Sequence, residues 1–526
     1  MDTHAELTHG MSFQSVDGSI TSNRTLDGFV DDNTGGNTSR FPGHDEEIPL
    51  LLDDAKEAAI VLSKLLEYTG GLPNLDKTAL WAILHSDSYR TDPLLTKDEI
   101  SALCSISLPG PDGNEVPIPV YGPNDVATSG GKPAPNLGVL LCPSGNMSHE
   151  YERRRNISLE MAGKVVVTAM SRAMAFTAYQ SLWFSKIRYV LPVTTFSKKQ
   201  CTSIAAPFLV AILPAMGYHR LTPRDVLYGP YRFGGQALFD LFTEQGIDGL
   251  KLLIGHLRSD NDIAQLLLIL LSYLQLIAGT RAPYLQSCAA RLPHVPATWL
   301  GHLRYFMSTF RGSLLIDGLW IPTPPRHQDV FLMDSILDYR GPKSPTDTEL
   351  LHFNACRMYI RASFLSCITT PNGRHIASDF LDGNRRLDST WNWPDLPRPP
   401  ARCWRTWRRW LKRLFSPNSS RTHRVTSPMK LSRCSRLGAY HTSSHHVTHE
   451  WYYSPTEDRA FHTETDGSIT QFRDAYRGDG TYARCSDPAD VLPPDSLPAT
   501  IDFYNLDSVQ LHRAPVLCPS LARPSS

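Results

Sequence analysis

The 526-residue chain lacks the cysteine spacings that zinc and redox sites use. Its ten cysteines include no C-x-x-C pair and none of the spacings typical of a zinc knuckle. We therefore expect reduced, mostly buried thiols in an intracellular protein, either nuclear or cytoplasmic. The N-terminus is polar and carries Asp2, His4 and Glu6. This composition does not match a secretory signal peptide, so we do not expect secretion.

Long apolar runs are also missing. The one candidate membrane span, residues 264–278, is shorter than the ~20 residues that a transmembrane helix needs. Gln265, Ser272 and Gln275 interrupt it, and an acidic residue, Asp262, stands just before it. We predict a buried core helix at this place and no transmembrane segment.

Net charge is absent as well, since 52 basic residues balance 52 acidic ones. The balance hides an asymmetry, because no acidic residue occurs between Asp395 and Glu450 while arginine and lysine recur there. A basic block inside a neutral chain favours a surface that faces a polyanion. The chain length suggests two to four domains, and an apolar fraction of 41% allows a sizeable core.

Two adjacent carboxylates stand out near the N-terminus. Phe29 and Val30 precede Asp31 and Asp32, and a glycine-rich segment follows. Apolar residues that anchor a strand, followed by carboxylates at a turn, suit a β-hairpin tip that holds a hard cation such as Mg²⁺. We predict a hairpin over residues 24–36. Taken alone, the acidic pair is equally compatible with chance.

Two further stretches follow this acidic box in order. Residues 70–78 read GGLPNLDKT, and residues 136–145 read NLGVLLCPSG. Together with FVDD, they resemble the last three palm motifs of reverse transcriptases of the non-LTR retrotransposon kind. Those motifs are the (Y/F)-x-D-D metal box, the G-L-x-x-N-x-x-K-T motif and the L-G-V turn of the primer-grip hairpin. The resemblance covers residues 10–415.

The resemblance implies roles for the matching residues. Asp31 and Asp32 would bind Mg²⁺ or Mn²⁺ in two-metal nucleotidyl transfer, with no organic cofactor. Lys77 would approach the phosphates of the incoming nucleotide and protonate the pyrophosphate, or it is a solvated lysine at a strand end. The remaining matches would contact primer or nucleotide: Asn74, Gly138 and Val139.

The family's catalytic centre needs more than these residues. Its fingers, and an aspartate from an earlier palm motif, have no match in this sequence: the aspartates before Asp31 are Asp2, Asp17 and Asp27, in unlike surroundings. We therefore expect a fragment of an RNA-directed DNA polymerase that is inactive alone. Whether the chain acts as an enzyme stays an open question. The alternatives are a non-catalytic nucleic-acid-binding protein derived from a retroelement, and a decayed element that folds poorly.

The residue pattern predicts an α+β fold with a small sheet, a covering helix from residue 45 to Gly70 and a strand at 74–84; the resemblance implies that this sheet is a partial palm. Helices should form the thumb and connection, with a break at Leu191 and Pro192. The expected regions are 1–90 (partial palm), 91–148 (insertion and primer-grip-like hairpin at 136–147), 149–240 (thumb), 241–415 (helical connection) and 416–526 (flexible basic tail with a small β element at 450–475).

Three consecutive arginines, Arg153, Arg154 and Arg155, stand near the start of the thumb-like region. The resemblance implies that their helix lies along the template–primer duplex, where arginine side chains reach phosphates. The alternative is a solvated helix face. Residues 216–240 also mix arginine with aromatic residues and glycine, which suits either a loop on a phosphate backbone or a structural turn.

Tryptophan and arginine alternate over residues 404–415, which predicts an amphipathic helix with one apolar and one basic face. Such a helix can stack bases and pair phosphates, lie on an anionic membrane, or dock its tryptophans on the protein core with the arginines outward. The residues expected to bind nucleic acid are Trp404, Arg405, Trp407, Arg408 and Arg409.

The expected partners are an RNA template and a DNA primer, or another nucleic acid, and no membrane. The sequence leaves the oligomeric state open. A histidine-rich tract can bind metal, and four histidines follow Cys434: His441, His445, His446 and His449. Because no carboxylate or cysteine stands at a finger-like spacing from them, we do not expect a zinc site.

Overall fold

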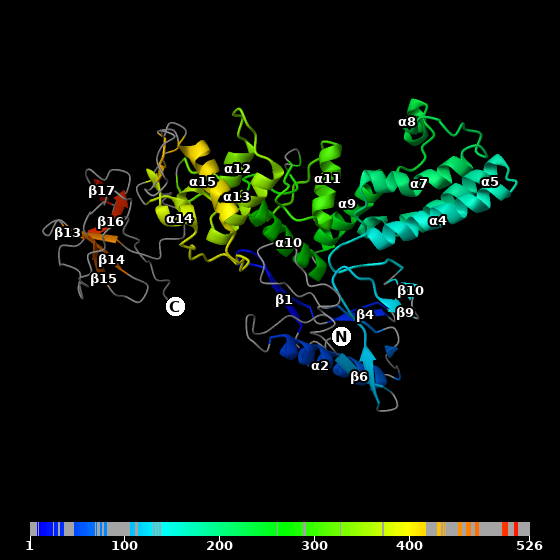
Figure 1. Ribbon diagram of the computed structural model, residues 1–526, viewed down its shortest axis with the longest axis horizontal. Helices are drawn as coiled ribbons and strands as arrows, with labels where there is room; N and C mark the ends of the chain where they lie inside the picture. The colour runs from blue at the N-terminus through cyan, green and yellow to red at the C-terminus, as the bar shows by residue number, and fades with distance from the viewer. Residues whose placement is uncertain are drawn as a thin grey trace, which may run out of the picture. The chain divides into compact units, whose positions relative to one another are not determined.

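The computed structural model combines many helices with several small sheets, which is compatible with the expected α+β class. The chain divides into two units: residues 1–274, 284–291 and 295–319 form the first, and residues 275–283, 292–294 and 320–526 form the second (Figure 1). The residues that the structure describes are 8, 10–24, 26–29, 32–35, 47–68, 70, 74–75, 78–81, 106–110, 114–129, 132–133, 135, 138–259, 261–286, 288, 291–326, 328–370, 373–416, 429–432, 435, 437, 451–454, 459–463, 469–472, 497–502 and 510–513.

The first unit begins with short strands that pair mainly as hairpins. Antiparallel pairs join β1 to β2, β3 to β4, β6 to β7 and β9 to β10, while β5 pairs with β8 in parallel. The strands are β1 (Met11–Gln14), β2 (Thr21–Arg24), β3 (Leu26–Phe29), β4 (Asp32–Gly35), β5 (Leu80–Trp81), β6 (Ile106–Pro109), β7 (Glu115–Ile118), β8 (Val120–Tyr121), β9 (Thr128–Ser129) and β10 (Lys132–Pro133).

The hairpin predicted over residues 24–36 is confirmed by β3 and β4. Phe29 pairs with Asp32, so two residues connect the strands. The covering helix is confirmed as α2 (Glu47–Tyr68), and the N–H of Gly70, whose φ is +84°, donates to the Glu67 carbonyl at 3.0 Å just beyond its end. One apolar face of α2 packs against buried side chains of β6 and β7.

The strand predicted over residues 74–84 is wrong in its first half. Asn74 and Leu75 lie in a tight turn, and of the residues described within 74–84 only Leu80–Trp81 forms a strand. The turn closes because the Thr78 hydroxyl donates to the Asn74 carbonyl at 3.0 Å and the Thr78 N–H donates to the Leu75 carbonyl at 3.1 Å. A threonine that bonds the local backbone competes with strand pairing at this place.

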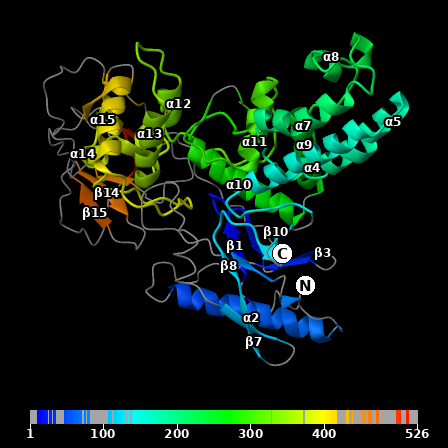
Figure 2. The same ribbon diagram turned by 45° about the vertical axis from the view of Figure 1, so that its right-hand side comes forward.

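Helices make up the rest of the first unit. Figures 1 and 2 both show α4 and α7 side by side. Residues 168–171 are not helical, so they end α4 within the region where the sequence predicted thumb helices. The helical segments are α4 (Ser148–Val167), α5 (Arg172–Thr177), the π-helical η2 (Ala178–Phe184), α6 (Ser185–Arg188), the 3₁₀ turn η3 (Leu191–Val193), α7 (Lys198–Ile212), α8 (Arg224–Tyr228), the 3₁₀ turn η4 (Tyr231–Phe233), α9 (Leu241–Ser259), α10 (Asp262–Ala278) and α11 (Trp299–Thr309).

The core between α4 and α7 is aromatic. Trp183 is fully buried, stacks on Phe208 with ring centroids 4.8 Å apart, and donates its indole N–H to Ser158 on α4 at 2.9 Å. A buried indole needs such a partner, because an unpaired buried N–H costs ~1–3 kcal/mol. The predicted break at Leu191 and Pro192 is confirmed by η3, which separates α6 from α7.

The apolar run at residues 264–278 forms α10, and most of its leucines and isoleucines are buried or partly buried, as predicted. The β1–β2 turn packs on this helix, since the N–H of Val16 donates to the Ser272 hydroxyl at 3.1 Å. Within the described ranges, no single helix has the length and apolarity to cross a membrane. The pair α9 and α10, bent by 112°, passes that test together.

The second unit carries its own helices and strands. They are α12 (Leu332–Leu337), α13 (Asp347–Ile360), the 3₁₀ turn η5 (Leu365–Ile368), β11 (His375–Ile376), α14 (Ser378–Asp382), α15 (Ala401–Phe415), β12 (Met429–Lys430), β13 (Trp451–Ser454), β14 (Arg459–Thr463), β15 (Ile469–Phe472), β16 (Leu497–Asp502) and β17 (Gln510–Arg513). The small β element predicted at 450–475 is confirmed by β13, β14 and β15. Two strands that the sequence did not predict extend it to a five-stranded sheet, in the order β15-β14-β13-β16-β17.

A fully buried arginine organises the core of the second unit. The Arg357 guanidinium donates to the carbonyls of Leu276 (2.6 Å) and Ile277 (2.9 Å) and to the Asn354 side chain (2.9 Å). It thereby caps the C-terminal carbonyls of α10, where a positive charge is favourable. Burial lowers the pKa of Arg357 to about 9, so the residue is still a cation at neutral pH.

A second polar group, Gln245, links three segments of the first unit. Its amide oxygen accepts from the Thr194 hydroxyl (3.0 Å) and from the N–H of Phe196 (3.1 Å), and its amide nitrogen lies 2.6 Å from His302 Nε2. Burial lowers the pKa of His302 to about 4. The imidazole is therefore neutral at pH 7, and its Nε2 can accept a hydrogen bond from the amide N–H of Gln245.

We predict that His302 makes the first unit sensitive to acid. Because its pKa is lower in the folded chain than the ordinary value of 6.5, the unfolded chain binds more protons between these values. Stability should therefore fall as the pH drops from 6.5 to about 4, by up to about 3 kcal/mol. Urea unfolding at several pH values should show this slope reduced in His302→Gln. An unchanged slope in the variant would contradict the assignment.

Candidate nucleic-acid interface

The acidic box that the sequence singles out lies at the β3–β4 hairpin. Asp32 begins β4 opposite Phe29, whereas Asp31 and Lys77 lie outside the described residues. Asn74 is exposed in its turn. In the part of the chain that the structure describes, no group of three or more His, Cys, Asp or Glu residues could hold a metal ion. The four histidines of residues 441–449 are also outside the described ranges.

The L-G-V turn is built around a glycine that needs its backbone conformation. Gly138 has φ +79°, and a Cβ at this position would lie 3.1 Å from the Tyr189 ring. Val139 and Leu140, which follow, are buried. The side chain of Val139 therefore belongs to the core, and its primer-contacting role stays a prediction for the backbone of the turn alone. A second turn at Gly145, with φ +76°, completes the segment expected to be a hairpin.

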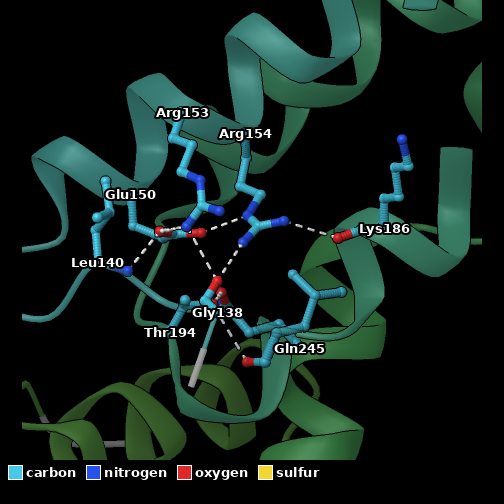
Figure 3. A network of polar contacts seen from close by, with 9 residues as sticks. Gly138, Leu140, Glu150, Arg153, Arg154, Lys186, Thr194 and Gln245 are labelled. Atoms are coloured by element: carbon cyan, nitrogen blue, oxygen red, sulfur yellow. Dashed lines mark hydrogen bonds and ion pairs between the residues drawn. The ribbon is translucent and has the colours of Figure 1, made fainter. Parts of the chain in front are cut away.

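A buried carboxylate fixes this turn to the first turns of α4. Glu150 is fully buried, and its Oε2 accepts a hydrogen bond of 2.8 Å from the N–H of Leu140 (Figure 3). Its Oε1 accepts a charge-assisted hydrogen bond from Nε of Arg154. A buried carboxylate is tolerated only when it is both paired and hydrogen-bonded, and both conditions are met here.

The Arg154 guanidinium uses its remaining groups on backbone carbonyls. It donates to Lys186 at 2.9 Å and to Gly138 at 3.0 Å, and its side chain points into the network drawn in Figure 3. Arg153 also donates to the Gly138 carbonyl at 3.0 Å and lies 3.6 Å from the Glu150 carboxylate. Arg154 is 5% exposed, so the phosphate-binding role expected of it is corrected. The Arg153 side chain is 34% exposed, and its expected role stays a prediction.

Arg155 differs from its two neighbours because successive helix residues are ~100° apart. It is exposed, on a face of α4 that continues through Leu159, Gly163 and Val166 at helical spacing. Val166 is 70% exposed, and a Cβ at Gly163 would meet nothing within 4 Å. This face, which we call the outer face of α4, combines one cation with an open apolar surface.

The predicted amphipathic helix is confirmed as α15, and its tryptophans face the core. The indole N–H of Trp404 donates to the Pro399 carbonyl at 2.9 Å, and that of Trp407 donates to the Phe380 carbonyl at 3.0 Å. Trp407 also packs on Phe353 of α13, with ring centroids 4.5 Å apart. Of the three interpretations of this pattern, docking on the core is therefore observed. Base stacking by Trp404 and Trp407 is corrected, because both rings are buried.

The basic face of α15 is partly neutralised within the chain. Arg408 forms an ion pair with Asp382, and Arg409 forms one with Glu349. Arg405 is exposed. Exposed ion pairs are worth at most about 1 kcal/mol, so these pairs orient the two side chains without removing them from solvent. Of the expected nucleic-acid contacts on α15, the arginines remain at the surface and the tryptophans do not.

Comparisons with known proteins identify no relative. A scan against protein-family models, a search of curated proteins and a search of solved structures each find no match to this chain. The likeness to a reverse transcriptase therefore rests on the three sequence motifs.

We predict that Arg154→Met destabilises the first unit by about 3–5 kcal/mol, because it leaves the Glu150 carboxylate buried without its partner. The matched control Arg155→Met should change stability by less than about 0.5 kcal/mol, since Arg155 is exposed. The double variant Glu150→Gln with Arg154→Met should recover part of the loss, because no buried charge remains unpaired. Urea unfolding measures all three. Equal effects of the two arginine substitutions would contradict this account.

The docking of α15 leads to a parallel prediction for the second unit. Trp407→Ala should cost about 3–5 kcal/mol of stability, because it opens a cavity against Phe353 and leaves the Phe380 carbonyl unpaired. Arg405→Ala should cost less than about 0.5 kcal/mol. Thermal unfolding of the two variants compares them directly. A Trp407→Ala protein as stable as the wild type would show that the tryptophan face is not part of the core.

Proposed function

We propose that this chain is the palm and thumb portion of an RNA-directed DNA polymerase of the retroelement kind, with an RNA template and a DNA primer as its partners. The observation that carries the proposal is the β3–β4 hairpin. Its register pairs Phe29 with Asp32 and leaves a two-residue connection within FVDD. Asp32 begins β4 and Asp31 precedes it in the sequence, and two adjacent carboxylates offer the oxygen ligands that a divalent cation prefers.

The order of the following elements supports the same proposal. A long helix, α2, packs on neighbouring strands after the hairpin, and the L-G-V turn is then bonded to the first turns of α4. The Glu150–Arg154 network makes that connection rigid, so a strand end bound at the turn would keep a fixed distance from the helices. Polymerases depend on such positioning, because holding the reactants in place supplies much of the rate enhancement.

The donor set accounts for part of a catalytic centre. Asp31 and Asp32 offer the hard oxygen ligands that Mg²⁺ prefers, and Mg²⁺ would neutralise charge on the triphosphate during phosphoryl transfer. A two-metal site also needs a carboxylate from another strand. We therefore propose that synthesis requires a segment that carries the family's earlier aspartate motif, and that this chain without it binds primer–template but does not extend the primer.

The second candidate is a non-catalytic nucleic-acid-binding protein derived from such an element. The outer face of α4 favours it, since Arg155 and its apolar neighbours are exposed independently of the acidic box. The two candidates share the nucleic-acid contact and differ in whether Asp31 matters. Binding and synthesis must therefore be measured separately.

We predict that the full chain binds a labelled RNA–DNA primer–template with an affinity that falls as salt rises. Arg155→Glu should weaken binding and reduce the salt slope by about one, because one phosphate contact is lost. Asp31→Ala should bind as the wild type does. Fluorescence anisotropy at several salt concentrations measures these effects. Failure of the wild type to bind any primer–template would contradict both candidates.

Synthesis then separates the candidates. A reverse-transcriptase segment with fingers and the earlier aspartate motif is joined upstream of Met1, and primer extension is measured with Mg²⁺. We expect RNA-templated synthesis that Asp31→Ala reduces more than about a hundredfold, since it removes a metal ligand. Asp53→Ala, at an exposed acidic residue of α2, is the matched control and should retain activity. Extension that survives Asp31→Ala would contradict the polymerase proposal, and binding without extension would favour the second candidate.

A further inference from the structure

The loop that follows α8 presents two aromatic rings to solvent. Tyr231 is 69% exposed and Phe233 is 75% exposed, and both belong to the 3₁₀ turn η4, which has no buried residue. Figures 1 and 2 both draw α8 above α7, at the upper edge of the helical part of the first unit. Side chains of this size are normally buried, so two in one exposed turn need an explanation.

The turn is held rigidly by its own backbone. The N–H of Gln236 donates to the Val226 carbonyl at 2.9 Å, that of Leu238 to the Leu227 carbonyl at 2.8 Å, and that of Gly235 to the Pro230 carbonyl at 3.1 Å. A Cβ at Gly235 would lie 2.0 Å from the Gly229 carbonyl oxygen, so the two glycines allow the chain to cross itself closely.

The base of the loop is attached to the helices beneath it. The Tyr218 hydroxyl donates to the Gln236 side chain, and the Arg172 guanidinium lies 5.8 Å from the centre of the Tyr218 ring. At the end of the loop, the N–H of Phe239 donates to the Tyr179 hydroxyl at 2.8 Å, and the Phe239 ring stacks on Phe184 with centroids 4.1 Å apart. The exposed rings therefore project from a fixed support.

The charge around the rings is positive. Residues 216–240 carry three arginines, Arg220, Arg224 and Arg232, against two carboxylates, Asp225 and Asp240. The Arg232 guanidinium lies 4.7 Å from the centre of the Phe233 ring. Among the described residues, no ion pair links Arg220 or Arg232 to a carboxylate. The exposed aromatic surface thus has one cation, Arg232, directly beside it and available to an anionic partner.

We propose that the turn Tyr231–Phe233 is a stacking platform for single-stranded nucleic acid, on which unpaired bases stack against Tyr231 and Phe233 while Arg232 contacts phosphate. A single strand offers bases that stack on flat aromatic rings and phosphates that attract a cation, and this turn provides both kinds of contact. The preformed turn lowers the ordering cost of binding. The site is separate from the acidic box, although its class of partner rests on the proposed function.

The rings and the charge together favour this occupant over a protein surface. An apolar protein patch would use the rings but leave the arginines of the loop without partners, whereas a single strand engages both. A duplex is a poorer match, because its bases are already stacked on one another and present only edges in the grooves.

Binding of the full chain to a fluorescein-labelled oligouridine of about 12 nucleotides, measured by anisotropy, tests the proposal. Tyr231→Ala and Phe233→Ala should each weaken binding roughly 5- to 100-fold. Phe233→Tyr keeps an aromatic ring and should bind as the wild type does. Arg232→Gln should reduce the salt slope by about 0.7. The control is Tyr68→Ala, which removes a more fully exposed ring at the end of α2 and should leave binding unchanged. Circular dichroism confirms that all variants fold.

A primer–template duplex measured in parallel separates the possible failures. Two results would overturn the stacking platform and leave the proposed function intact. One is single-strand binding that neither ring substitution weakens, and the other is duplex binding without single-strand binding. Ring-dependent single-strand binding without duplex binding would support the platform and contradict the proposed function. Absence of both would overturn both. Loss of binding in Tyr68→Ala to the same extent would show a general surface effect and also overturn the platform.

Discussion

The pairing of one buried carboxylate governs how the first unit is joined together. Glu150 is fully buried, and the positions of Arg154, the Leu140 N–H and the Gly138 carbonyl follow from the need to satisfy its charge and that of its partner. A buried ion pair is seldom a source of net stability, but removal of one member is costly. The network therefore specifies one arrangement of the L-G-V turn on α4, and the candidate interface inherits that geometry.

This constraint explains what the sequence could and could not predict. Helical spacing predicted α2 and α15 correctly, because an apolar stripe has to be buried wherever it docks, and the short apolar run at 264–278 predicted α10 as a core helix. The sequence does not distinguish the three consecutive arginines at 153–155, but the rotation of the helix places Arg154 in the core and Arg155 at the surface. Only the position of the partner carboxylate distinguishes them, and Glu150 gave no local signal of its burial.

The short strands were also hard to predict from the sequence. A strand is stabilised by its neighbours across the sheet, so the five-stranded sheet of the second unit could be predicted only where alternation was strong, in β13 to β15. The strands β16 and β17 lie in a proline- and serine-rich stretch; β16 is stabilised by pairing with β13, and β17 by pairing with β16. The tryptophan pattern of α15 likewise predicted its helix, while only the surrounding helices decide that the rings face inward.

Photocrosslinking tests the central claim most directly. The full chain would be crosslinked to a primer–template that carries 4-thiouridine in both its paired region and its single-stranded overhang, and the attached peptides identified by mass spectrometry. The account predicts crosslinks on the outer face of α4 from the duplex and at the turn Tyr231–Phe233 from the overhang. Crosslinks confined to Trp404 and Trp407 of α15, or no crosslinks at all, would contradict it.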